Sequence, residues 1–284
     1  MAGPVRALVV GSVNVDLHVR VSEHPGRGET VIGSELSRLP GGKGGNQAVA
    51  LARLGAQVRL HAAVGEDADG QWSIDQLERA GVDVADVVRL AGATTGSALV
   101  VVEDDGSNRI VVVPGANATL PAVSSVGDAD VVVAQLEVPV AVVADALASA
   151  RRASVLTVLN AAPALSLPPN MLADVDVLVV NYPEAQVLAG DGDPATLARC
   201  VVVTLGADGA RVHADGEVVQ VPAPRVEVVD TTGAGDCFVA ALAYDLARGR
   251  PLATAVEFAC RAASASVTSA GARGGLPTLA QVES

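Results

Sequence analysis

The segment Val229-Asp230-Thr231-Thr232-Gly233-Ala234-Gly235-Asp236-Cys237-Phe238 leads directly into an apolar run that extends from Cys237 to Leu246. Because this run has helical character, we expect Gly233 to Asp236 at a helix N-terminus, where free backbone N–H groups and the helix dipole favour an anion. A carboxylate repels an anion, but its presence is explained if Asp236 removes a proton from a hydroxyl that attacks a phosphoryl group. A helix with Asp in its first turn explains the segment equally well, so both interpretations are open.

A second glycine-rich segment, Pro40-Gly41-Gly42-Lys43-Gly44-Gly45-Asn46-Gln47, precedes a helical pattern over Ala48 to Leu54 that Gly55 ends. A lysine at a helix N-terminus opposes the dipole, so Lys43 is better explained as a donor to an oxygen-rich ligand. The segment is not a Walker A loop, because Gly44 stands where Ser or Thr is needed. The Gly233 segment is not a Rossmann fingerprint either, because Phe238 occupies the place of the third glycine.

Polar residues follow several apolar strands at the points where we expect the strands to end. The run Ala7 to Val10 predicts a central buried strand, with Asn14 and Asp16 soon after it. Alternation places these two side chains on one side of the chain, but an Asx-rich turn is an equal alternative. The full set of polar residues at strand ends is Asn14, Asp16, Glu137, Asn160, Asn181 and Glu184. Ligands bind outside the carboxyl ends of parallel strands, so this segregation predicts a site.

The order of elements predicts an α/β protein with a central, mostly parallel sheet flanked by helices. Residues 28–39 are strand-like, and Gly70 to Ala80 predicts a helix. From Asp130 onward, strands and helices alternate regularly, and the last helices are expected over about Asp236 to Arg248 and Leu252 to Ser269. Hairpin signals occur at Asp105-Gly106 and at Asp215-Gly216. The first hairpin does not belong to a βαβ series, and with residues 12–39 it predicts a small accessory sheet. We expect a single domain over residues 1–284, with the small sheet drawn from about 12–39 and 96–113.

Composition narrows the class of partner. The chain has 284 residues and a net charge of −13, which argues against nucleic acid or an anionic membrane as the main partner. No apolar run reaches 18 residues, and we expect a cytoplasmic protein. Cys200, Cys237 and Cys260 are widely spaced and predict neither a disulfide framework nor a zinc site. Cys237 follows Asp236, but without a nearby His it is better explained as a buried helix residue than as a nucleophile.

Two segments, Gly41 to Ala48 and Asp230 to Asp236, resemble the two signature motifs of the PfkB family of sugar kinases, also called the ribokinase family. Four shorter segments resemble the same family in the same order, and the resemblance covers nearly the full chain. These segments are Gly11 to Asp16, Pro114 to Ala118, Gln135 to Glu137, and Asn160 to Ala164. The resemblance implies a three-layer ribokinase-like α/β fold whose small β-sheet is a lid over the sugar.

The resemblance also implies an activity, the ATP-dependent phosphorylation of D-ribose at its 5-hydroxyl to give D-ribose 5-phosphate and ADP. Another sugar or nucleoside kinase of the family, fructokinase-like or adenosine-kinase-like, is the nearest alternative. A non-catalytic sugar-binding or nucleotide-binding sensor is a further alternative, which the intact Asp236 and glycine loop disfavour.

Residue roles follow from the resemblance, position by position. Asp236 would be the base, and the amides of Gly233, Ala234, Gly235 and Asp236 the anion hole. The sugar would be held by Asn14, Asp16, Gly42, Lys43, Asn46 and Glu137. ATP with Mg²⁺, partly through water, would be held by Asn181, Glu184, Thr204, Gly206, Gly209, Gly235 and Cys260. A monovalent cation, usually K⁺, would be held mostly through backbone carbonyls by Asp230, Thr232, Ser266, Ser269, Gly271 and Gly275. The lid would also form a homodimer contact.

The sequence departs from the family pattern at several places. Thr232-Gly233 replaces the Ile-Ala common in the family, and Pro183 stands where many relatives have a polar residue. The segment between Leu188 and Cys200 is short, lacking most of a helix, and Cys260 stands where relatives often place a polar residue beside the adenine. These departures concern the nucleotide and cation sites more than the type of reaction.

Overall fold

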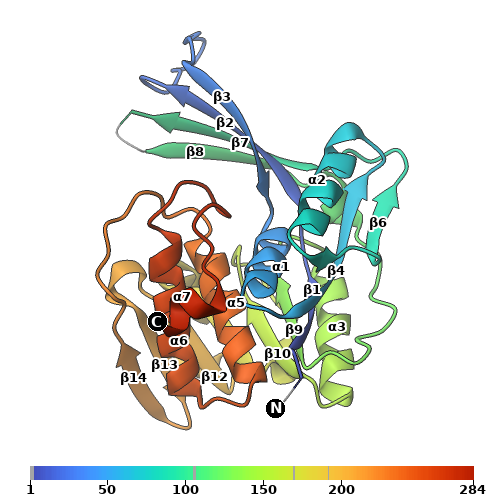
Figure 1. Cartoon of the computed structure of the whole chain (residues 1–284), viewed down its shortest axis with the longest axis vertical. Helices are drawn as coiled ribbons and strands as arrows, with labels where there is room; N and C mark the ends of the chain where they lie inside the picture. Colours follow the sequence, from blue (N-terminus) through green and yellow to red (C-terminus); the bar gives the residue numbers. More distant parts are fainter. Residues whose placement is uncertain (1–2, 105–106, 169, 191) are drawn as a thin grey trace.

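The computed structural model describes residues 3–104, 107–168, 170–190 and 192–284, and these form two sheets and their flanking helices (Figure 1). The larger sheet has the strand order β14-β13-β12-β11-β10-β9-β1-β4-β5, and β6 pairs with β4. Its strands are β1 (Arg6–Val10), β4 (Gln57–Gly65), β5 (Val82–Asp83), β6 (Val87–Leu90), β9 (Val131–Gln135), β10 (Leu156–Asn160), β11 (Val177–Asn181), β12 (Cys200–Thr204), β13 (Ala210–Ala214) and β14 (Glu217–Val221). The pairs β12–β13 and β13–β14 are antiparallel, and the other pairs are parallel.

The central strands form where the sequence has uninterrupted apolar runs, because parallel strands of this kind are covered on both faces. In β1, Leu8, Val9 and Val10 are each 0% exposed. The strand β1 pairs with β4 on one side and with β9 on the other. The strand order therefore reverses beside β1, and this reversal opens a crevice at the carboxyl ends of the strands.

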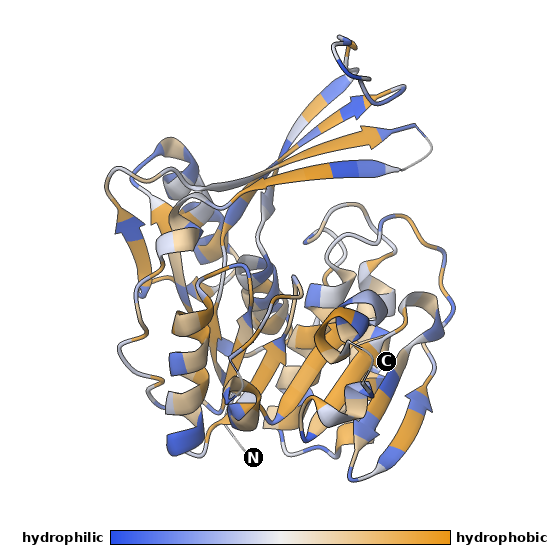
Figure 2. Cartoon of the chain, turned by 180° about the vertical axis from the view of Figure 1, so that it is seen from behind, coloured by the Kyte–Doolittle hydropathy of each residue, from blue (hydrophilic) through white to orange (hydrophobic). Residues whose placement is uncertain are grey.

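Helices cover both faces of the larger sheet. Ala7 and Val9 pack into a core cluster with α1 (Lys43–Arg53), α2 (Ala68–Arg79), α5 (Ala234–Ala247), α6 (Leu252–Ser266) and α7 (Leu279–Glu283). Leu8 and Val10 face the opposite cluster, with α3 (Val140–Arg152) and α4 (Tyr182–Ala189). Short 3₁₀ turns are η1 (Gly115–Thr119), η2 (Met171–Asp174), η3 (Pro194–Thr196) and η4 (Gly206–Asp208). Figure 2 shows the hydrophobic strands enclosed between these layers.

The small sheet extends beyond the body of the molecule (Figure 1). Its order is β3-β2-β7-β8, with β2 (Asn14–Val21), β3 (Glu35–Gly41), β7 (Gly96–Glu103) and β8 (Asn108–Val113). The β2–β7 pair is parallel and the outer pairs are antiparallel. Several of its apolar side chains are exposed, namely Leu36, Leu99, Ile110, Val111, Val112 and Val113.

The predicted fold class is confirmed, and the differences lie at element boundaries. Helix α1 begins at Lys43 rather than Ala48, because Gly42 ends the preceding strand with φ +83° and the following glycines are already helical. A Cβ on Gly44 would lie 2.6 Å from the carbonyl carbon of Gly11, so only glycine lets the helix start this close to β1. The strand-like segment predicted over residues 28–39 is a strand only from Glu35.

Two other predicted boundaries move for local reasons. The helix expected from Gly70 begins at Ala68, because the Asp67 side chain accepts a hydrogen bond from Gly70 N and caps it. The last long helix, expected to reach Ser269, ends at Ser266. Asp105-Gly106 lies outside the described residues, while Asp215 and Gly216 turn between β13 and β14 with φ of +51° and +80°.

Candidate active site

The predicted site residues gather at the carboxyl ends of β1 and β9 and at the N-termini of α1 and α5. Asp236 lies in the first turn of α5 and is 6% exposed. Its Oδ1 accepts a hydrogen bond from Gln47 Nε2, and its Oδ2 accepts one from Asn46 Nδ2, both at 3.0 Å. Both donors belong to α1, so the two glycine-rich segments meet at this carboxylate.

A buried chain of amides lies behind Asp236. Gln47 Oε1 accepts a hydrogen bond from Gln135 Nε2 at 2.5 Å, and Gln47 Nε2 also donates to Asn160 Oδ1 at 3.2 Å. Gln47 and Gln135 are each 0% exposed. Buried amides of this kind are held in one orientation by their partners, so the chain fixes the carboxylate in place.

The entrance of α5 presents free backbone donors. Gly233 caps the helix in the left-handed region with φ +77°, and Ala234 N donates to Thr231 O at 3.2 Å. Among the described residues, the amides of Gly233, Gly235 and Asp236 have no acceptor. A Cβ on Gly233 would lie 2.7 Å from Ala272 O, so glycine is required by both conformation and space. Free donors at a helix start suit an anion, and the Ala234 amide is the one predicted donor that already has an acceptor.

The predicted sugar residues on the β1 side are held by two side chains that sequence reasoning did not assign to the site, those of Ser12 and Asn117, and by the backbone of Lys43. Asn14 is 5% exposed, and its Oδ1 accepts a hydrogen bond from Asn117 Nδ2 at 2.8 Å. Glu137 Oε2 accepts hydrogen bonds from Ser12 Oγ at 2.5 Å and from the backbone N of Lys43 at 3.0 Å. Each side chain therefore keeps one polar end that these contacts do not use.

Asp16 is the least satisfied carboxylate of the site. Its Oδ1 is buried and has no hydrogen-bond partner among the described residues. Burial and the negative charge of Glu137 raise the pKa of Asp16 to about 6, although Arg273 opposes the shift. A Cβ on Gly41 would lie about 2 Å from this carboxyl group, so Gly41 provides the space for it. A buried acceptor without a donor fits a ligand that brings a hydroxyl group.

Lys43 supplies positive charge between the carboxylates. Burial lowers the pKa of its ammonium, but the negative charges of Asp236, Glu137 and Glu184 outweigh burial and raise that pKa overall. The lysine is therefore charged at neutral pH. This placement agrees with the prediction that Lys43 acts as a donor to an oxygen-rich ligand rather than as a helix cap.

The predicted nucleotide residues lie at the ends of β11 and β12. Asn181 and Thr204 are register partners across these parallel strands. Asn181 Oδ1 accepts from Glu184 N, and Glu184 Oε2 accepts from Asn181 N, both at 2.8 Å, so the two form a capping box for α4. Asn181 is exposed and Glu184 is partly buried, and each keeps unused acceptor capacity. Cys260 is 3% exposed in the core cluster, so its thiol offers little surface to a ligand.

Gly206 and Gly209, also predicted to bind the nucleotide, flank a 3₁₀ turn after β12 and adopt φ of +59° and +89°. A Cβ on Gly209 would lie 2.0 Å from Val221 O, so this turn packs closely on the end of β14. Among the described residues, no group of three or more His, Cys, Asp or Glu side chains could hold a metal ion. A site for Mg²⁺ here would therefore need oxygen atoms from ATP and water in addition to Asn181 and Glu184.

The predicted cation residues come from two segments that lie together. Asp230 Oδ1 accepts from Thr232 N, and Asp230 Oδ2 accepts from Gly271 N, both at 2.8 Å. Burial raises the pKa of Asp230, but these hydrogen bonds outweigh it and lower the pKa overall. A Cβ on Gly275 would lie 2.0 Å from Ser266 O. Ser269 lies in the loop that follows α6. A carboxylate with crowded backbone carbonyls is an oxygen-rich donor set that suits a hard cation such as K⁺.

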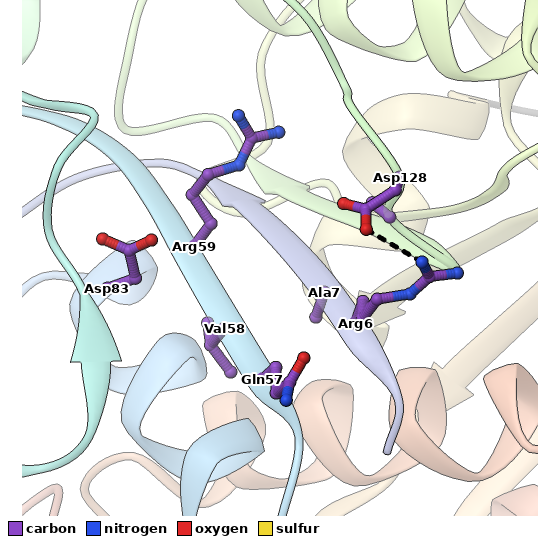
Figure 3. A pocket seen from close by; sticks show the side chains of 8 residues that line it. Arg6, Ala7, Gln57, Val58, Arg59, Asp83 and Asp128 are labelled. Atoms are coloured by element: carbon purple, nitrogen blue, oxygen red, sulfur yellow. Dashed lines mark hydrogen bonds and ion pairs between the residues drawn. The ribbon is translucent and has the colours of Figure 1, made fainter. Parts of the chain in front are cut away.

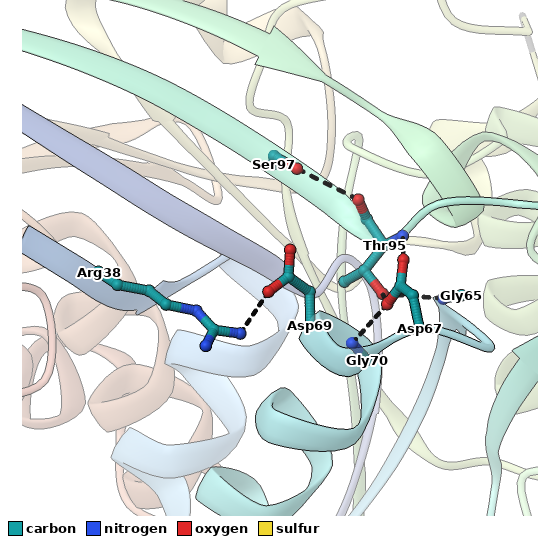
Figure 4. Close-up of polar contacts among 7 residues, drawn as sticks. All are labelled: Arg38, Gly65, Asp67, Asp69, Gly70, Thr95 and Ser97. Carbon is teal, nitrogen blue, oxygen red and sulfur yellow. Dashed lines mark hydrogen bonds and ion pairs between the residues drawn. The ribbon is translucent and has the colours of Figure 1, made fainter.

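Hydrogen bonds of Asp67 join the small sheet to helix α2 of the larger sheet's layers. Asp67 Oδ2 accepts from Thr95 N at 2.8 Å, and Asp67 Oδ1 accepts from Thr95 Oγ1 at 2.6 Å and from Gly70 N at 2.7 Å (Figure 4). Thr95 directly precedes β7 of the small sheet, and Asp67 caps α2. Burial raises the pKa of Asp67, but these hydrogen bonds outweigh it and lower the pKa overall. One carboxylate thus joins the start of a small-sheet strand to the body.

Sequence reasoning missed Ser12, Gln47, Asn117, Gln135 and Arg273 as site residues. Four of them are uncharged and lie beside predicted residues along the chain or inside segments already recognised. Arg273 is different, because it comes from the loop after α6 and reaches Asn46. A charged residue between glycines, in Gly271-Ala272-Arg273-Gly274-Gly275, was the signal that could have found it.

Another depression lies at the opposite, amino end of the strands. It has a volume of about 190 Å³ and is lined by Arg6, Ala7, Gln57, Val58, Arg59, Asp83, Asp128 and Ala129 (Figure 3). Arg6 is paired with Asp128 and Asp130, and Arg59 with Asp86. Its arginines are thus already neutralised by carboxylates, and the depression adds nothing to the site described above.

Comparison with known proteins defines the class. Residues 6–279 match the model of the pfkB family carbohydrate kinases, so the chain belongs to this family. Among curated proteins, it is 35% identical to the ribokinase of Schizosaccharomyces pombe, over 98% of this chain and 97% of that protein. It is 38% identical to the ribokinase of Bacillus subtilis, over 97% of each protein.

Solved structures give the same result. The structure of Arabidopsis thaliana ribokinase complexed with ribose and ATP superposes with a TM-score of 0.90 at 32% identity, covering 100% of this chain and 98% of that one. Thermotoga maritima ribokinase superposes with a TM-score of 0.90 at 31% identity, covering 99% and 98%. The predicted family is therefore confirmed. No helix in the described ranges is both long and apolar enough to cross a membrane.

Proposed function

We propose that the protein phosphorylates the 5-hydroxyl of D-ribose with ATP, giving D-ribose 5-phosphate and ADP. The observation that carries this proposal is the position of Asp236. It lies beside the free amides of α5 and is held by Asn46 and Gln47 of the other signature segment. Ribokinases of similar sequence over nearly the whole chain support ribose as the sugar.

In the mechanism, Asp236 removes the proton from the primary hydroxyl as that oxygen attacks the γ-phosphorus. ATP with Mg²⁺ supplies the phosphoryl group and the charge neutralisation that phosphoryl transfer requires. The amides of Gly233, Gly235 and Asp236 donate hydrogen bonds to the phosphate oxygens, where negative charge develops in the transition state. These hydrogen bonds are strong because the site excludes water. The amide chain through Gln47 keeps the Asp236 carboxylate aimed at the hydroxyl, and the Lys43 ammonium offsets the surrounding negative charge.

The sugar is held by polar ends that the protein leaves unused. Asp16 Oδ1 accepts a hydrogen bond from a sugar hydroxyl, which removes the cost of a buried, unpartnered acceptor. Asn14 Nδ2 and the second oxygen of Glu137 contact other hydroxyls, and Gly42 and Asn46 complete the contact. These unused groups include both hydrogen-bond donors and acceptors, and such a mixture suits a polyhydroxylated ligand better than an apolar one.

The remaining roles are also part of the proposal. Residues 1–284 act as one kinase domain, in which the small sheet closes over the sugar and excludes water. Its exposed apolar side chains, Leu36, Leu99 and Ile110 to Val113, support a homodimer contact through this lid. Asp230 and the loop after α6 hold K⁺ behind the anion site. We expect the protein in the cytoplasm, where both ATP and K⁺ are available.

A coupled ADP-release assay tests the function. The purified protein is given ATP and Mg²⁺ with ribose, fructose, adenosine or tagatose 6-phosphate, each with and without K⁺. We expect the highest kcat/KM with ribose and stimulation by K⁺. A preference for fructose or adenosine would identify another kinase of the family. ATP binding without turnover of any substrate would instead indicate a sensor and overturn the proposal.

A further inference from the structure

Arg273 brings a positive charge into the sugar site from a loop far away in sequence. Its Nε donates to Asn46 Oδ1 at 2.9 Å, and its Nη2 donates to Gly41 O at 3.3 Å. A Cβ on Gly45 would lie 2.6 Å from the same Nη2, so the guanidinium packs against the bare face of this glycine and a side chain there would displace it. The arginine is therefore built into the site rather than resting on its surface.

The contact determines which way the Asn46 amide points. A guanidinium only donates hydrogen bonds, and an ionised carboxylate only accepts them. Asn46 lies between Arg273 and Asp236, so its oxygen faces the arginine and its nitrogen faces the carboxylate. If the arginine is removed, the Asn46 amide loses the contact that holds its oxygen, and its nitrogen is then free to rotate away from Asp236.

The charge of Arg273 also acts on the carboxylates. The groups that act on Asp16 are Glu137 and Asp236, which raise its pKa, and Arg273, which lowers it. Lys43 acts on Asp236 and Glu137 instead. The geometry agrees, because Arg273 Nη2 donates to Gly41 O at 3.3 Å and a Cβ on Gly41 would lie about 2 Å from the Asp16 carboxyl group, so both charges lie around the same glycine.

We propose that Arg273 is a positioning residue of the sugar site, which orients the Asn46 amide toward Asp236 and offsets the charge of Asp16. This inference rests on the proposed function, because it assigns Asn46, Asp16 and Asp236 to a sugar and its acceptor hydroxyl. It goes beyond that function by giving the loop after α6, expected to hold K⁺, a direct part in the sugar site.

Four variants separate the roles of the guanidinium. Arg273→Met keeps the length but removes charge and donors, and Arg273→Lys keeps the charge. Gly45→Ala keeps Arg273 but forces its Nη2 away from Gly41. Arg53→Gln is the matched control, because Arg53 holds the same loop through Leu276 O at 3.0 and 3.3 Å without touching the site.

The readouts are kcat and KM for ribose and for ATP, the pH dependence of kcat/KM, and thermal unfolding. We expect Arg273→Met to lower kcat/KM for ribose about 30-fold, to change KM for ATP less than about threefold, and to move the acid limb to higher pH, since a lost charge–hydrogen-bond contact has effects of this order. Arg273→Lys should restore the acid limb and part of kcat. Gly45→Ala should lower kcat while leaving the acid limb near its place, and Arg53→Gln should alter thermal unfolding alone.

Two outcomes would overturn the inference. One is an Arg273→Met protein with wild-type ribose kinetics and pH profile; the other is an equal effect of Arg53→Gln on both. If the wild type phosphorylates no sugar, the proposed function fails instead. A crystal structure of Arg273→Met then tests the placement without turnover, because Asn46 should leave Asp236 if the inference holds and should keep its contact if it does not.

Discussion

Gln47 Nε2 lies 3.0 Å from Asp236 Oδ1, and the glutamine that makes this contact is itself 0% exposed. An amide buried so deeply cannot rotate freely, and its hydrogen bond therefore holds the carboxylate in one orientation. The contact joins the end of one signature segment to the end of the other across 189 positions of the chain. The base is therefore oriented by the segment that is proposed to hold the sugar.

We expect Gln47→Met to lower kcat for ribose about 10- to 100-fold, because a hydrogen bond to a charged group contributes about 1.5 to 3 kcal/mol. The affinity for ribose should change less, since Gln47 faces the carboxylate rather than the proposed sugar pocket. Steady-state kinetics and calorimetric ribose binding measure the two effects. Gln186→Met, on the exposed side of α4, is the control and should behave as wild type. A kcat equal to wild type in Gln47→Met would show that Asp236 needs no such support.

Asp236→Asn tests the base itself. The substitution keeps the size of the side chain but removes its capacity to accept a proton, so turnover should fall at least about 100-fold. Ribose binding, measured by calorimetry, should remain within a few-fold, because the proposed sugar contacts come from other residues. Retention of more than about a tenth of wild-type kcat would exclude Asp236 as the base.

Asp16 predicts an acid limit for sugar binding. Its pKa of about 6 means that the carboxylate gains a proton as the pH falls through that value and can no longer accept two hydroxyl hydrogen bonds. KM for ribose should therefore rise below about pH 6, while KM for ATP should respond less. A pH series of steady-state measurements gives both constants, and a ribose KM that is constant between pH 5 and 8 would contradict the assignment.

The same carboxylate lowers stability at neutral pH. Its pKa is higher in the folded protein than the value near 3.9 expected for an unfolded chain. Its contribution is most favourable below pH 4, falls as the pH rises, and is unfavourable above about pH 6. At pH 7 the free energy of unfolding of Asp16→Asn should therefore exceed that of wild type by on the order of 2 kcal/mol, and the variant should unfold at a higher temperature. At pH 4 we expect no such gain. Thermal unfolding at the two pH values checks the difference, with activity lost in the variant.

Features that depend on short stretches of the chain could be predicted from the sequence. Apolar runs identified the buried strands, and the polar residues after them were predicted at the correct edge of the sheet. The resemblance of two glycine-rich segments supplied the family and the expected roles. Gly42 was assigned to the sugar and Gly233 to the anion hole, but the positive φ at both and the close approach of backbone atoms were not predicted.

Contacts across the fold were not predictable in the same way. The link from Arg273 to Asn46 spans 227 positions, and no local pattern connects a loop arginine with a helix asparagine. The chain from Gln47 to Gln135 and Asn160 is likewise visible only when helix α1 and the strands β9 and β10 have been placed. Some element boundaries differ from the prediction because a single residue determines them. The Asp67 cap, for example, starts α2 at Ala68, two residues before the expected Gly70.

The last prediction concerns the attachment of the small sheet. Arg38 of β3 donates to Asp69 of α2 (Figure 4). Its guanidinium also lies 4.2 Å from the ring centroid of Trp72. Arg38 and Asp69 are 39% and 48% exposed as side chains, so the ion pair is screened by solvent. We expect the two contacts together to stabilise the docked position of the small sheet by only about 1 kcal/mol.

A contact of this strength changes an opening equilibrium without unfolding the protein. Arg38→Gln should therefore raise KM for ribose about threefold to tenfold at low salt, because more of the protein has the sheet open, while thermal unfolding stays close to wild type. The difference from wild type should shrink in high salt, which screens the ion pair in the wild type as well. Arg20→Gln, an exposed arginine on the neighbouring strand β2, is the control. An unchanged KM in Arg38→Gln at low salt would contradict this prediction and would mean that other contacts hold the sheet, such as the three hydrogen bonds that the partly buried Asp67 carboxylate accepts from Gly70 and Thr95.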